Sequence, residues 1–328
     1  MKKTMIKFIA ILMAVMTLVG YSIPVSAQAT KLKVAIVQLV SHPSLDEITQ
    51  GIKEELSTKG YKEGDNLEID FQNAEGDMSL LNSIAEGVVA KKPDVIFAIT
   101  TPVAQSLQQA TSDIPIVLAG ITDPVGAKLV TALDKTDGNI TGVSDAAPLE
   151  ALFDQFKALN TNAKTIGMLY TTSEDNAKAE VEKAKAIAEK LGYKVEVATI
   201  DSTNDMALVA ENLAAKVQAI FIPTDNTIAS SIATLLDMTD KAGIPVIPTF
   251  EKAVGEGALF SVAISQANIG KQSADMALQI VKEGKAIQDL PIEFAKETVK
   301  VYNQKAADAL NISLPDQMKQ DFKDVSGE

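Results

Sequence analysis

The chain has 328 residues and a net charge of −13, with 43 acidic residues, 30 basic residues that are all lysine, and no cysteine. An acidic balance of this size argues against nucleic-acid and anionic-membrane partners, because both require basic patches. Without cysteine the chain can form no disulfide, thiol nucleophile or cysteine-ligated metal site, and without arginine it has no bidentate guanidinium clamp for a carboxylate or phosphate.

The N-terminus has the features of a secretory signal peptide. Three lysines precede residue 8, an apolar run covers residues 8–20, and Val25, Ser26 and Ala27 supply the small residues that a signal peptidase recognises. The apolar run is shorter than the roughly 20 residues that span a bilayer, so a transmembrane anchor is the less favoured interpretation. We therefore predict a signal peptide at 1–27 and an exported protein, periplasmic or extracellular.

Leu18-Val19-Gly20-Tyr21 has the form of a lipoprotein signal in which Tyr21 replaces the cysteine that would carry the lipid. No lipid anchor can form on the chain as written, because it contains no cysteine. Cleavage after Ala27 removes three lysines and leaves 27 lysines against 43 acidic residues, a net charge of −16. The roughly 300 remaining residues are enough for two domains, each with its own core.

After residue 31, apolar runs that favour strands alternate with amphipathic stretches that favour helices. This alternation indicates βαβ units and a parallel sheet. The predicted elements of the first half are a strand at 32–38, a helix at 44–59, a strand at 67–72, a helix at 78–91, a strand at 95–99, a helix at 101–110 and a strand at 116–119.

The pattern restarts after a segment rich in turn residues, 134–145. A final group of elements is too small for a third domain, and we interpret it as the chain returning to complete both halves. The predicted elements are strands at 165–170, 195–200, 219–222 and 245–249 with helices at 175–190, 206–216 and 227–242, then a strand at 258–264, a helix at 268–283 and a strand at 297–302.

The restart predicts an α/β fold of two doubly wound parallel-sheet lobes joined by a multi-strand hinge, with a cleft between them. The first lobe covers residues 30–143 and is completed by about 265–290, and the second covers 144–264 and is completed by about 291–328. A single large α/β sheet is the alternative, and both the length of the chain and the restart disfavour it.

Polar and turn-forming residues gather where the predicted strands end. In open parallel sheets, ligands bind just beyond the carboxyl ends of the strands. The same residue types also occur in ordinary βα turns and at helix N-caps, so no single loop identifies a site. The segments concerned are residues 38–42, 73–77, 100–102, 122–124, 171–176, 223–226 and 250–251.

Thr100, Thr101 and Pro102 form the best candidate site for an anion. A threonine N-cap followed by proline leaves free helix N–H groups and hydroxyls, and the helix dipole there favours negative charge. Because the chain has no arginine, we expect this helix start to bind a ligand carboxylate.

Four carboxylates are candidates for pairing with a ligand ammonium, and each also has an ordinary structural explanation. Asp225 could instead cap a helix. Asp145, Glu174 and Glu251 could instead be solvated surface charges.

Tyr170, Phe250 and His42 complete the candidates. The two aromatic rings could form the wall of an apolar subsite or belong to the core. His42, the only histidine, is either a loop residue or a ligand contact, and by itself it specifies neither a metal site nor a catalytic triad. The chain also lacks nucleophile-elbow, Walker and dinucleotide-binding motifs, so we expect no enzyme activity, no cofactor and no metal.

Seven short segments at the predicted strand ends form an ordered series. They are His42-Pro43-x-Leu45-Asp46, Asn73-Ala74-x-Gly76-Asp77, Ala-Ile-Thr-Thr-Pro-Val-Ala-Gln at 98–105, Thr-Asp-Pro-Val-Gly-Ala at 122–127, Asn-Ile-Thr-Gly-Val-Ser-Asp at 139–145, Tyr170-x-x-x-Glu174-x-Asn176 and Pro-Thr-Asp-Asn at 223–226. Together they resemble the tryptophan/tyrosine-type ABC transporter substrate-binding protein family of the type I periplasmic-binding-protein superfamily. The resemblance runs from about Lys31 to Pro315, and its specificity lies in the order of the segments.

The resemblance implies two lobes, a hinge of three strands, a small aromatic or hydrophobic amino acid in the cleft, and an ABC permease and ATPase complex as partners. The sequence departs from the family pattern at two places. Tyr21 stands where a lipid-carrying cysteine would tether the protein to a membrane, and Thr100-Thr101 adds a hydroxyl that could shift the ligand preference. The resemblance places the same segments at the cleft, and the candidate ligand-binding residues are Gln38, His42, Pro43, Asn73, Thr100, Thr101, Thr122, Ser144, Asp145, Tyr170, Glu174, Asn176, Thr224, Asp225, Asn226 and Phe250.

Three other functions are alternatives to an importer receptor. A ligand-sensing module that partners a membrane sensor would have the same sequence features, and genomic neighbours would separate the two. A transcriptional regulator would need a helix-turn-helix before the first strand, where a signal peptide is predicted instead. A hydrolase would need a nucleophile with a base, which no motif supplies.

Overall fold

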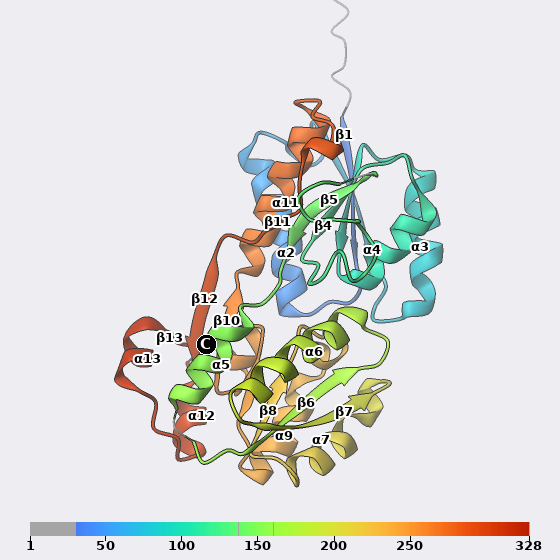
Figure 1. Cartoon of the computed structure of the whole chain (residues 1–328). Coiled ribbons are helices and arrows are strands. Elements are labelled where there is room, and N and C mark those ends of the chain that lie inside the picture. Colours follow the sequence, from blue (N-terminus) through green and yellow to red (C-terminus); the bar gives the residue numbers. More distant parts are fainter. Residues whose placement is uncertain (1–30, 137, 160, 328) are drawn as a thin grey trace, which may run out of the picture. The chain divides into compact units, whose positions relative to one another are not determined.

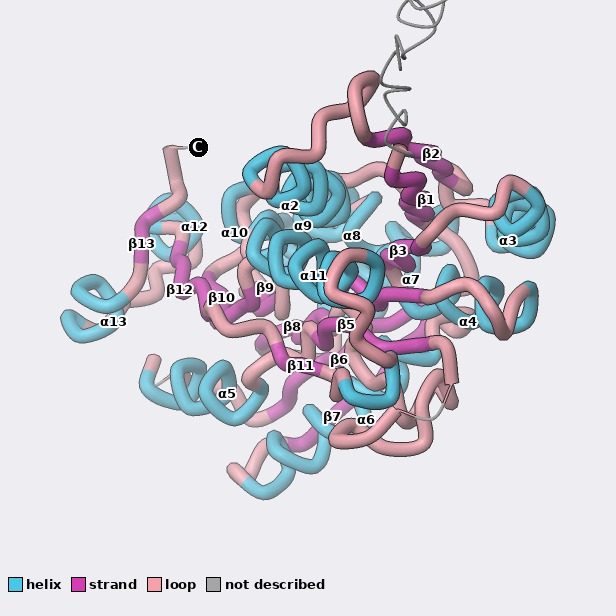
Figure 2. The backbone as a smooth tube through the Cα atoms, turned by 90° about the horizontal axis from the view of Figure 1, so that it is seen from above, coloured by secondary structure: helices cyan, strands magenta, loops and turns pink. Residues whose placement is uncertain are grey.

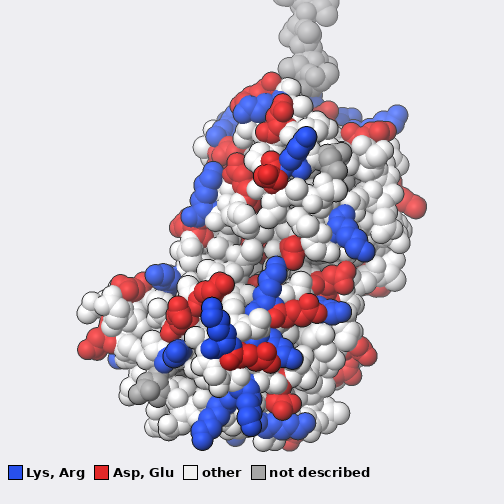
Figure 3. Space-filling view, in the orientation of Figure 1, with Lys and Arg blue, Asp and Glu red and all other residues white. Residues whose placement is uncertain are grey.

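The computed structural model describes residues 31–136, 138–159 and 161–327. The predicted signal peptide and Tyr21 lie outside the described residues. Within them, no helix is long and apolar enough to cross a membrane. Lysines and acidic residues are interspersed over the face seen in Figure 3, without an extended lysine patch on that face.

A six-stranded parallel sheet carries the first part of the fold, with the order β11-β5-β4-β3-β1-β2 (Figure 1). Alternate residues of β1 point to opposite faces, so that Ala35 and Val37 join one core and Val34 and Ile36 the other. The strands are β1 (Leu32–Gln38), β2 (Leu67–Asn73), β3 (Val95–Ile99), β4 (Ile116–Ala119), β5 (Ile140–Ser144) and β11 (Glu293–Phe294).

Helices cover both faces of this sheet. Two of them, α2 and α11, pack on one face, and α3 and α4 pack on the other (Figure 2). The helices are α2 (Pro43–Thr58), α3 (Leu81–Ala90) with the short η1 (Met78–Leu80) before it, α4 (Thr101–Ala110) and α11 (Gln266–Val281). We call this sheet and these helices the first lobe.

The second lobe contains a four-stranded parallel sheet of order β7-β6-β8-β9 and a three-stranded sheet of order β10-β12-β13. Helices α5 and α6 cover one face of the four-stranded sheet and α7 and α9 the other. The strands are β6 (Thr165–Thr171), β7 (Lys194–Ile200), β8 (Ala219–Ile222), β9 (Val246–Pro248), β10 (Phe260–Ile264), β12 (Thr298–Tyr302) and β13 (Lys323–Asp324). The helices are α5 (Leu149–Ala158), α6 (Asp175–Lys190), η2 (Thr203–Asp205), α7 (Met206–Ala214), α8 (Asn226–Ser230), α9 (Ile232–Ala242), α10 (Lys252–Gly255), α12 (Gln304–Ala309) and α13 (Asp316–Asp321), and η3 (Ile287–Asp289) follows α11.

Three connections join the lobes in the described chain, at residues 145–148, 265 and 295–297. Two backbone hydrogen bonds hold them side by side. The N–H of Ala295 donates to the carbonyl of Ser144 at 3.0 Å, and the N–H of Ser265 donates to the carbonyl of Glu297 at 3.0 Å. These connections form the hinge.

Most predicted elements agree with the structure to within a few residues, but the region between the two halves does not. Residues 140–144, interpreted as part of a turn-rich segment, form the buried strand β5, and helix α5 was not predicted. Strand β11 extends the first sheet, although residues from about 291 onward were assigned to the second lobe. The predicted helix at 227–242 is broken at Ser231, whose hydroxyl bonds to the carbonyl of Thr227 at 3.0 Å and so competes with the helix backbone.

Two glycines bring α2 and α11 into backbone contact. A Cβ at Gly270 would lie 2.1 Å from the carbonyl oxygen of Ile48, and a Cβ at Gly51 would lie 2.3 Å from that of Ala267. The two helices therefore approach more closely than any side chain would allow. This contact fixes the positions of the α2 and α11 N-termini, which both lead to the hinge side of the lobe (Figures 1 and 2).

Replacing Gly270 by alanine should destabilise the fold, because the added methyl group overlaps backbone atoms that cannot move independently. We expect a loss of about 1–3 kcal/mol in the free energy of unfolding, measured by urea denaturation. Gly87 in α3 is the matched control, since a Cβ there meets nothing within 4 Å. Gly87→Ala should leave stability unchanged or raise it by up to about 1 kcal/mol. Equal midpoints for the two variants would contradict this account of the α2–α11 contact.

Candidate functional site

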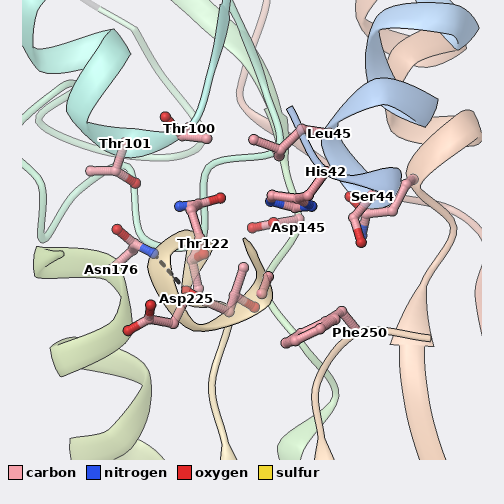
Figure 4. A pocket seen from close by; sticks show the side chains of 15 residues that line it. His42, Ser44, Leu45, Thr100, Thr101, Thr122, Asp145, Asn176, Asp225 and Phe250 are labelled. Carbon is pink, nitrogen blue, oxygen red and sulfur yellow. Dashed lines mark hydrogen bonds between the residues drawn. The ribbon is translucent and has the colours of Figure 1, made fainter. Parts of the chain in front are cut away.

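A narrow pocket lies between the lobes next to the hinge (Figure 4). It encloses about 430 Å³ of space not filled by protein atoms, part of it open to solvent. The lining residues are His42, Ser44, Leu45, Thr100, Thr101, Gly120, Thr122, Asp145, Asn176, Thr224, Asp225, Asn226, Ala229, Phe250 and Gln266.

The structure brings most of the predicted site residues together in this pocket, from positions far apart in the sequence. The first lobe and hinge contribute residues that follow β1, β3, β4 and β5, and the second lobe contributes residues that follow β6, β8 and β9. The predicted residues that line the pocket are His42, Thr100, Thr101, Thr122, Asp145, Asn176, Thr224, Asp225, Asn226 and Phe250.

Two further predicted residues support the pocket from behind. Gln38 donates to Asp46 at 2.7 Å and accepts from Thr49 at 2.6 Å, which holds the start of α2 against β1. Glu174 is fully buried and accepts hydrogen bonds from the backbone N–H groups of Asn226 and Thr227, at 3.0 and 2.9 Å. These two side chains bind neighbouring protein groups and do not line the pocket.

The remaining four predicted residues also lie outside the lining. Pro43 is exposed as the first residue of α2, and Asn73 accepts from the N–H of Glu75 in a local turn. Ser144 accepts from the N–H of Ala146 in the hinge, and the ring of Tyr170 packs against the second-lobe core. Each of these four residues therefore has an ordinary structural role in its loop or strand, which was the alternative to a role in ligand binding.

Five lining residues were not predicted: Ser44, Leu45, Gly120, Ala229 and Gln266. Gly120 directly follows the last residue of β4. The expectation that ligands bind at strand ends therefore applied to it too, but the predicted segment began at residue 122. Ser44 and Leu45 lie in the first turn of α2, behind the predicted His42. Gln266 begins α11, whose return to the first lobe gave no local signal in the sequence.

The first-lobe wall is built from helix N-termini. Thr100 is the N-cap of α4, His42 is the N-cap of α2 and Ser265 is the N-cap of α11. Each helix start directs unpaired N–H groups and the positive end of its dipole toward its N-terminus. Among the described residues no lysine lines the pocket. The wall therefore favours an anionic group without any basic side chain.

Thr100 has a strained backbone. Its φ of 88° and ψ of 152° lie in a region that β-branched residues rarely adopt. The surrounding structure holds it there, and the residue is only 4% exposed. Strain of this kind concentrates at functional sites, and here it belongs to the residue that opens the predicted anion site.

Four buried polar atoms of the lining have no hydrogen-bond partner in the described structure: His42 Nε2, Thr100 Oγ1, Asp145 Oδ1 and Asn176 Oδ1. Each of the four residues is more than nine-tenths buried. An unpaired buried polar group costs about 1–3 kcal/mol, so four in one pocket indicate a polar ligand.

The buried carboxylates of the pocket differ in their partners. Asp225 accepts from the N–H and hydroxyl of Thr171 at 2.6 and 2.9 Å and from the N–H of Ile228 at 2.9 Å, as the N-cap of α8. Burial, with the charge of Glu174 nearby, raises the pKa of Asp225 well above its ordinary value. Both oxygens of Asp225 thus bind protein groups, whereas Asp145 has one oxygen free to meet a ligand.

Burial also raises the pKa of Asp145 to about 6, against a hydrogen bond from Thr122 that lowers it. It raises the pKa of Glu180 to about 7, although the N–H of Thr224 donates to that carboxylate. The charge of Asp145 adds to the shift of Glu180. The hinge and second-lobe side of the pocket is therefore a place where negative charge is costly unless a cation joins it.

Polar contacts join the lobes at the mouth of the pocket. Lys183 of α6 lies 3.0 Å from Asp123, which follows β4, and Gln105 of α4 donates to Asp175 of α6 at 3.3 Å. On the hinge side, Lys252 of α10 pairs with Glu47 of α2. Such exposed pairs contribute roughly 0–1 kcal/mol each, so they adjust the closure of the lobes without dominating it.

The stability of the unliganded protein should fall as pH rises from about 4 to about 6. Asp145 releases its proton near its ordinary pKa of 3.8 when unfolded but only near 6 when folded, so the folded state is favoured below pH 4 and loses about 3 kcal/mol above pH 6. Asp145→Asn should remove this part of the pH dependence and be more stable than the parent above pH 6. Urea denaturation at several pH values measures it.

Asp289→Asn is the control for this experiment, because Asp289 is exposed and distant from the pocket. It should reproduce the pH profile of the parent. If Asp145→Asn shows the same dependence of stability on pH as the parent, Asp145 is not the source of the loss of stability between pH 4 and 6.

Comparison with known proteins identifies the family. The family model for "ABC transporter substrate binding protein" matches residues 33–325. The chain belongs to this family. It is a family of substrate-binding proteins, not of enzymes, and the predicted family resemblance is confirmed.

Two similar proteins have names or structures that mention a ligand. A "tyrosine-binding protein" of Clostridioides difficile strain R20291 is 38% identical over 279 residues, which are 85% of this chain and 81% of that protein. The structure of an ABC domain from Streptococcus pneumonia in complex with L-Trp is 41% identical, covers 89% of this chain and 99% of its own, and superposes with a TM-score of 0.86.

A ligand-free, open structure extends the comparison. It is a substrate binding protein with adhesive properties from Clostridium difficile, 36% identical over 90% of this chain and 99% of its own, and its TM-score is lower, at 0.70. A 5-methylthioribose transporter solute binding protein from Thermotoga lettingae shares the fold at 14% identity, with a TM-score of 0.62 over 90% of this chain and 98% of its own. These structural similarities confirm the predicted type I periplasmic-binding fold.

Proposed function

We propose that this ABC transporter substrate-binding protein is an exported receptor that encloses an aromatic amino acid, tryptophan or tyrosine, between its lobes and delivers it to an ABC permease and ATPase complex. The observation that carries the proposal is the set of four buried, unpartnered polar atoms gathered in one inter-lobe pocket. The names of the tyrosine-binding relative and of the L-Trp complex support the choice of ligand.

The ligand carboxylate binds at the first-lobe wall. The N-terminus of α4 supplies the N–H groups of Thr101 and Val103, which have no partner within the helix. The hydroxyl of Thr100, unpartnered and buried, adds a donor at the same place. With no lysine in the lining and no arginine in the chain, this is the strongest positive field that the pocket offers.

The ligand ammonium pairs with Asp145 at the hinge. A buried ammonium needs a carboxylate partner, because burying it alone is very costly. Of the four candidate carboxylates, Glu174 and Glu251 do not line the pocket, and the hydrogen bonds of Asp225 within the second lobe favour Asp145. The ammonium in turn would lower the cost of the negative charge on Asp145.

The aromatic side chain occupies the part of the pocket lined by Leu45, Ala229 and Phe250. Leu45 comes from the first lobe, and Ala229 and Phe250 come from the second, so the ring contacts both walls. A ligand that contacts both lobes favours their closed arrangement over the open one. The higher TM-score with the L-Trp complex than with the open, ligand-free structure agrees with closed lobes here.

A thermal-shift screen of the twenty amino acids tests the proposal. Tyrosine or tryptophan should raise the melting temperature, since a ligand at 100 times its dissociation constant adds about 2.7 kcal/mol of stability. Replacing Thr100 and Thr101 together by valine should weaken binding by about 1–3 kcal/mol, because the buried carboxylate loses donors. Calorimetry with the parent and the variant measures the difference.

The decarboxylated amines of the two amino acids are the matched control ligands, since they lack only the carboxylate. They should bind the parent weakly, and the threonine variant should bind them no worse than the parent does. No response of the parent to any amino acid would refute the proposed ligand class. Unchanged affinity of the threonine variant would refute only the assignment of the carboxylate site.

Export is tested by sequencing the N-terminus of the protein recovered from outside the cytoplasm. We expect the mature chain to begin at Gln28 and to carry no lipid, because Val25, Ser26 and Ala27 precede that residue and the chain has no cysteine. A chain that keeps Met1 and is found in the membrane fraction would contradict both expectations.

A further inference from the structure

The unpartnered atoms of the pocket are mostly acceptors. Asp145 Oδ1 can only accept a hydrogen bond when the carboxyl is ionised, and the hydroxyl of Thr100 can donate or accept. The amide of Asn176 is oriented by its own donor, because its Nδ2 bonds to the carbonyl of Thr224 at 2.7 Å and leaves Oδ1 buried without a partner. The fourth atom, His42 Nε2, depends on which nitrogen of the imidazole carries the proton.

A chain of hydrogen bonds fixes that proton. Glu174 accepts from Asn226 Nδ2 at 2.6 Å, which leaves the amide oxygen of Asn226 for His42. The hydrogen bond with Asn226 raises the pKa of His42. This direction is the one expected when the imidazole is the donor, because donation stabilises its protonated form. Since Nε2 has no partner, the nitrogen that meets Asn226 is Nδ1, and a neutral ring that donates from Nδ1 keeps a lone pair on Nε2.

Burial also favours the neutral form of the imidazole. Burial lowers the pKa of His42, and this outweighs the Asn226 hydrogen bond and the charges of Asp46 and Glu174, which raise it. His42 is the N-cap of α2, yet its side chain makes no capping hydrogen bond. Its ring therefore presents one acceptor to the pocket and has no capping role in α2.

His42 lies on the side of the pocket that Leu45 and Phe250 also line. Figure 4 shows it on the same side as Leu45, Ser44, Asp145 and Phe250, away from Thr101 and Asn176. The carboxylate of the proposed ligand occupies the part near Thr100 and Thr101, and its ammonium pairs with the free Oδ1 of Asp145. The ring of the ligand lies against Leu45 and Phe250, so a donor on that ring lies on the side of the pocket that holds the acceptor of His42.

We infer that His42 is a specificity-determining residue, whose Nε2 accepts the hydrogen bond of a donor on the ligand's aromatic side chain, the phenol O–H of tyrosine or the indole N–H of tryptophan. This inference rests on the proposed function. Phenylalanine has the same apolar ring but no such donor, so it would leave Nε2 buried and unpaired. Sites built for a hydrogen-bonding group reject ligands that lack it more strongly than apolar pockets reject small changes in size.

The experiment is a cycle of two proteins and two pairs of ligands, measured by calorimetry. L-tyrosine is compared with L-phenylalanine, and L-tryptophan with 3-benzothienyl-L-alanine, in which sulfur replaces the indole N–H. The parent should prefer the donor-bearing member of at least one pair by roughly 10- to 100-fold. In His42→Phe, which keeps a ring and removes no cap, this preference should fall to within about 3-fold.

Two control variants locate the effect. Thr101→Val, at the carboxylate end, should weaken both members of each pair and leave their ratio unchanged. Asn176→Leu, which removes the other neutral acceptor, should also leave the ratio unchanged. A ratio that collapses in Asn176→Leu and persists in His42→Phe would overturn the assignment to His42. A parent that binds both members of each pair equally would overturn the inference while leaving the proposed function intact.

The single histidine allows a second measurement that needs no variant. In protein labelled only in histidine and free of an affinity tag, the nitrogen NMR spectrum contains the signals of His42 alone. The spectrum should show an unprotonated Nε2, and its resonance should shift on addition of a donor-bearing ligand and not on addition of the matched analogue. A protonated Nε2 in the unliganded protein would overturn the inference.

Discussion

The backbone contact between α2 and α11 determines much of the pocket. Gly51 and Gly270 remove the side chains that would keep the helices apart, so Gly51 meets Ala267 and Gly270 meets Ile48 at main-chain distance. Helix α11 directly follows the connection at residue 265, which comes from the second lobe. The packing of α11 on α2 holds that connection against the first lobe. As a result His42, Ser44 and Gln266, from opposite ends of the chain, line the same pocket.

The absence of arginine shapes the chemistry of the pocket. Receptors for amino acids must neutralise a carboxylate and an ammonium inside a poorly hydrated space. Here the positive side is made from helix N-termini, which carry partial charge on main-chain N–H groups and need no side chain that could move or be solvated. The negative side is a buried carboxyl, Asp145, whose ionisation is costly until a cation arrives.

This pairing connects ligand binding to closure of the lobes. The walls that would hold the carboxylate and the ring belong to different lobes, and Asp145 belongs to the hinge between them. The exposed contact between Lys183 and Asp123 adds little energy, because the lysine is 58% exposed and the pair is screened by solvent. The main gain on closure therefore comes from satisfying buried polar atoms of both lobes with one molecule. A ligand with fewer donors would satisfy fewer of them and stabilise the closed arrangement less.

The sequence by itself determined the alternation of strands and helices, because the apolar runs of a buried parallel strand such as Val95–Ile99 are local and unambiguous. It also determined the class of the site, since ligands in such sheets bind at the strand ends and Thr100, Asp145 and Asn176 stand there. Strand β5 could not be predicted, because Gly142 adopts a φ of 144° against Leu118, a conformation favoured only by its neighbours in the sheet. Only the tertiary structure distinguished Asp225, held by Thr171 and Ile228, from Asp145, which retains a free oxygen. Both are acidic residues near strand ends. They differ in the hydrogen-bond donors that the fold brings close to them, and these donors belong to other parts of the sequence.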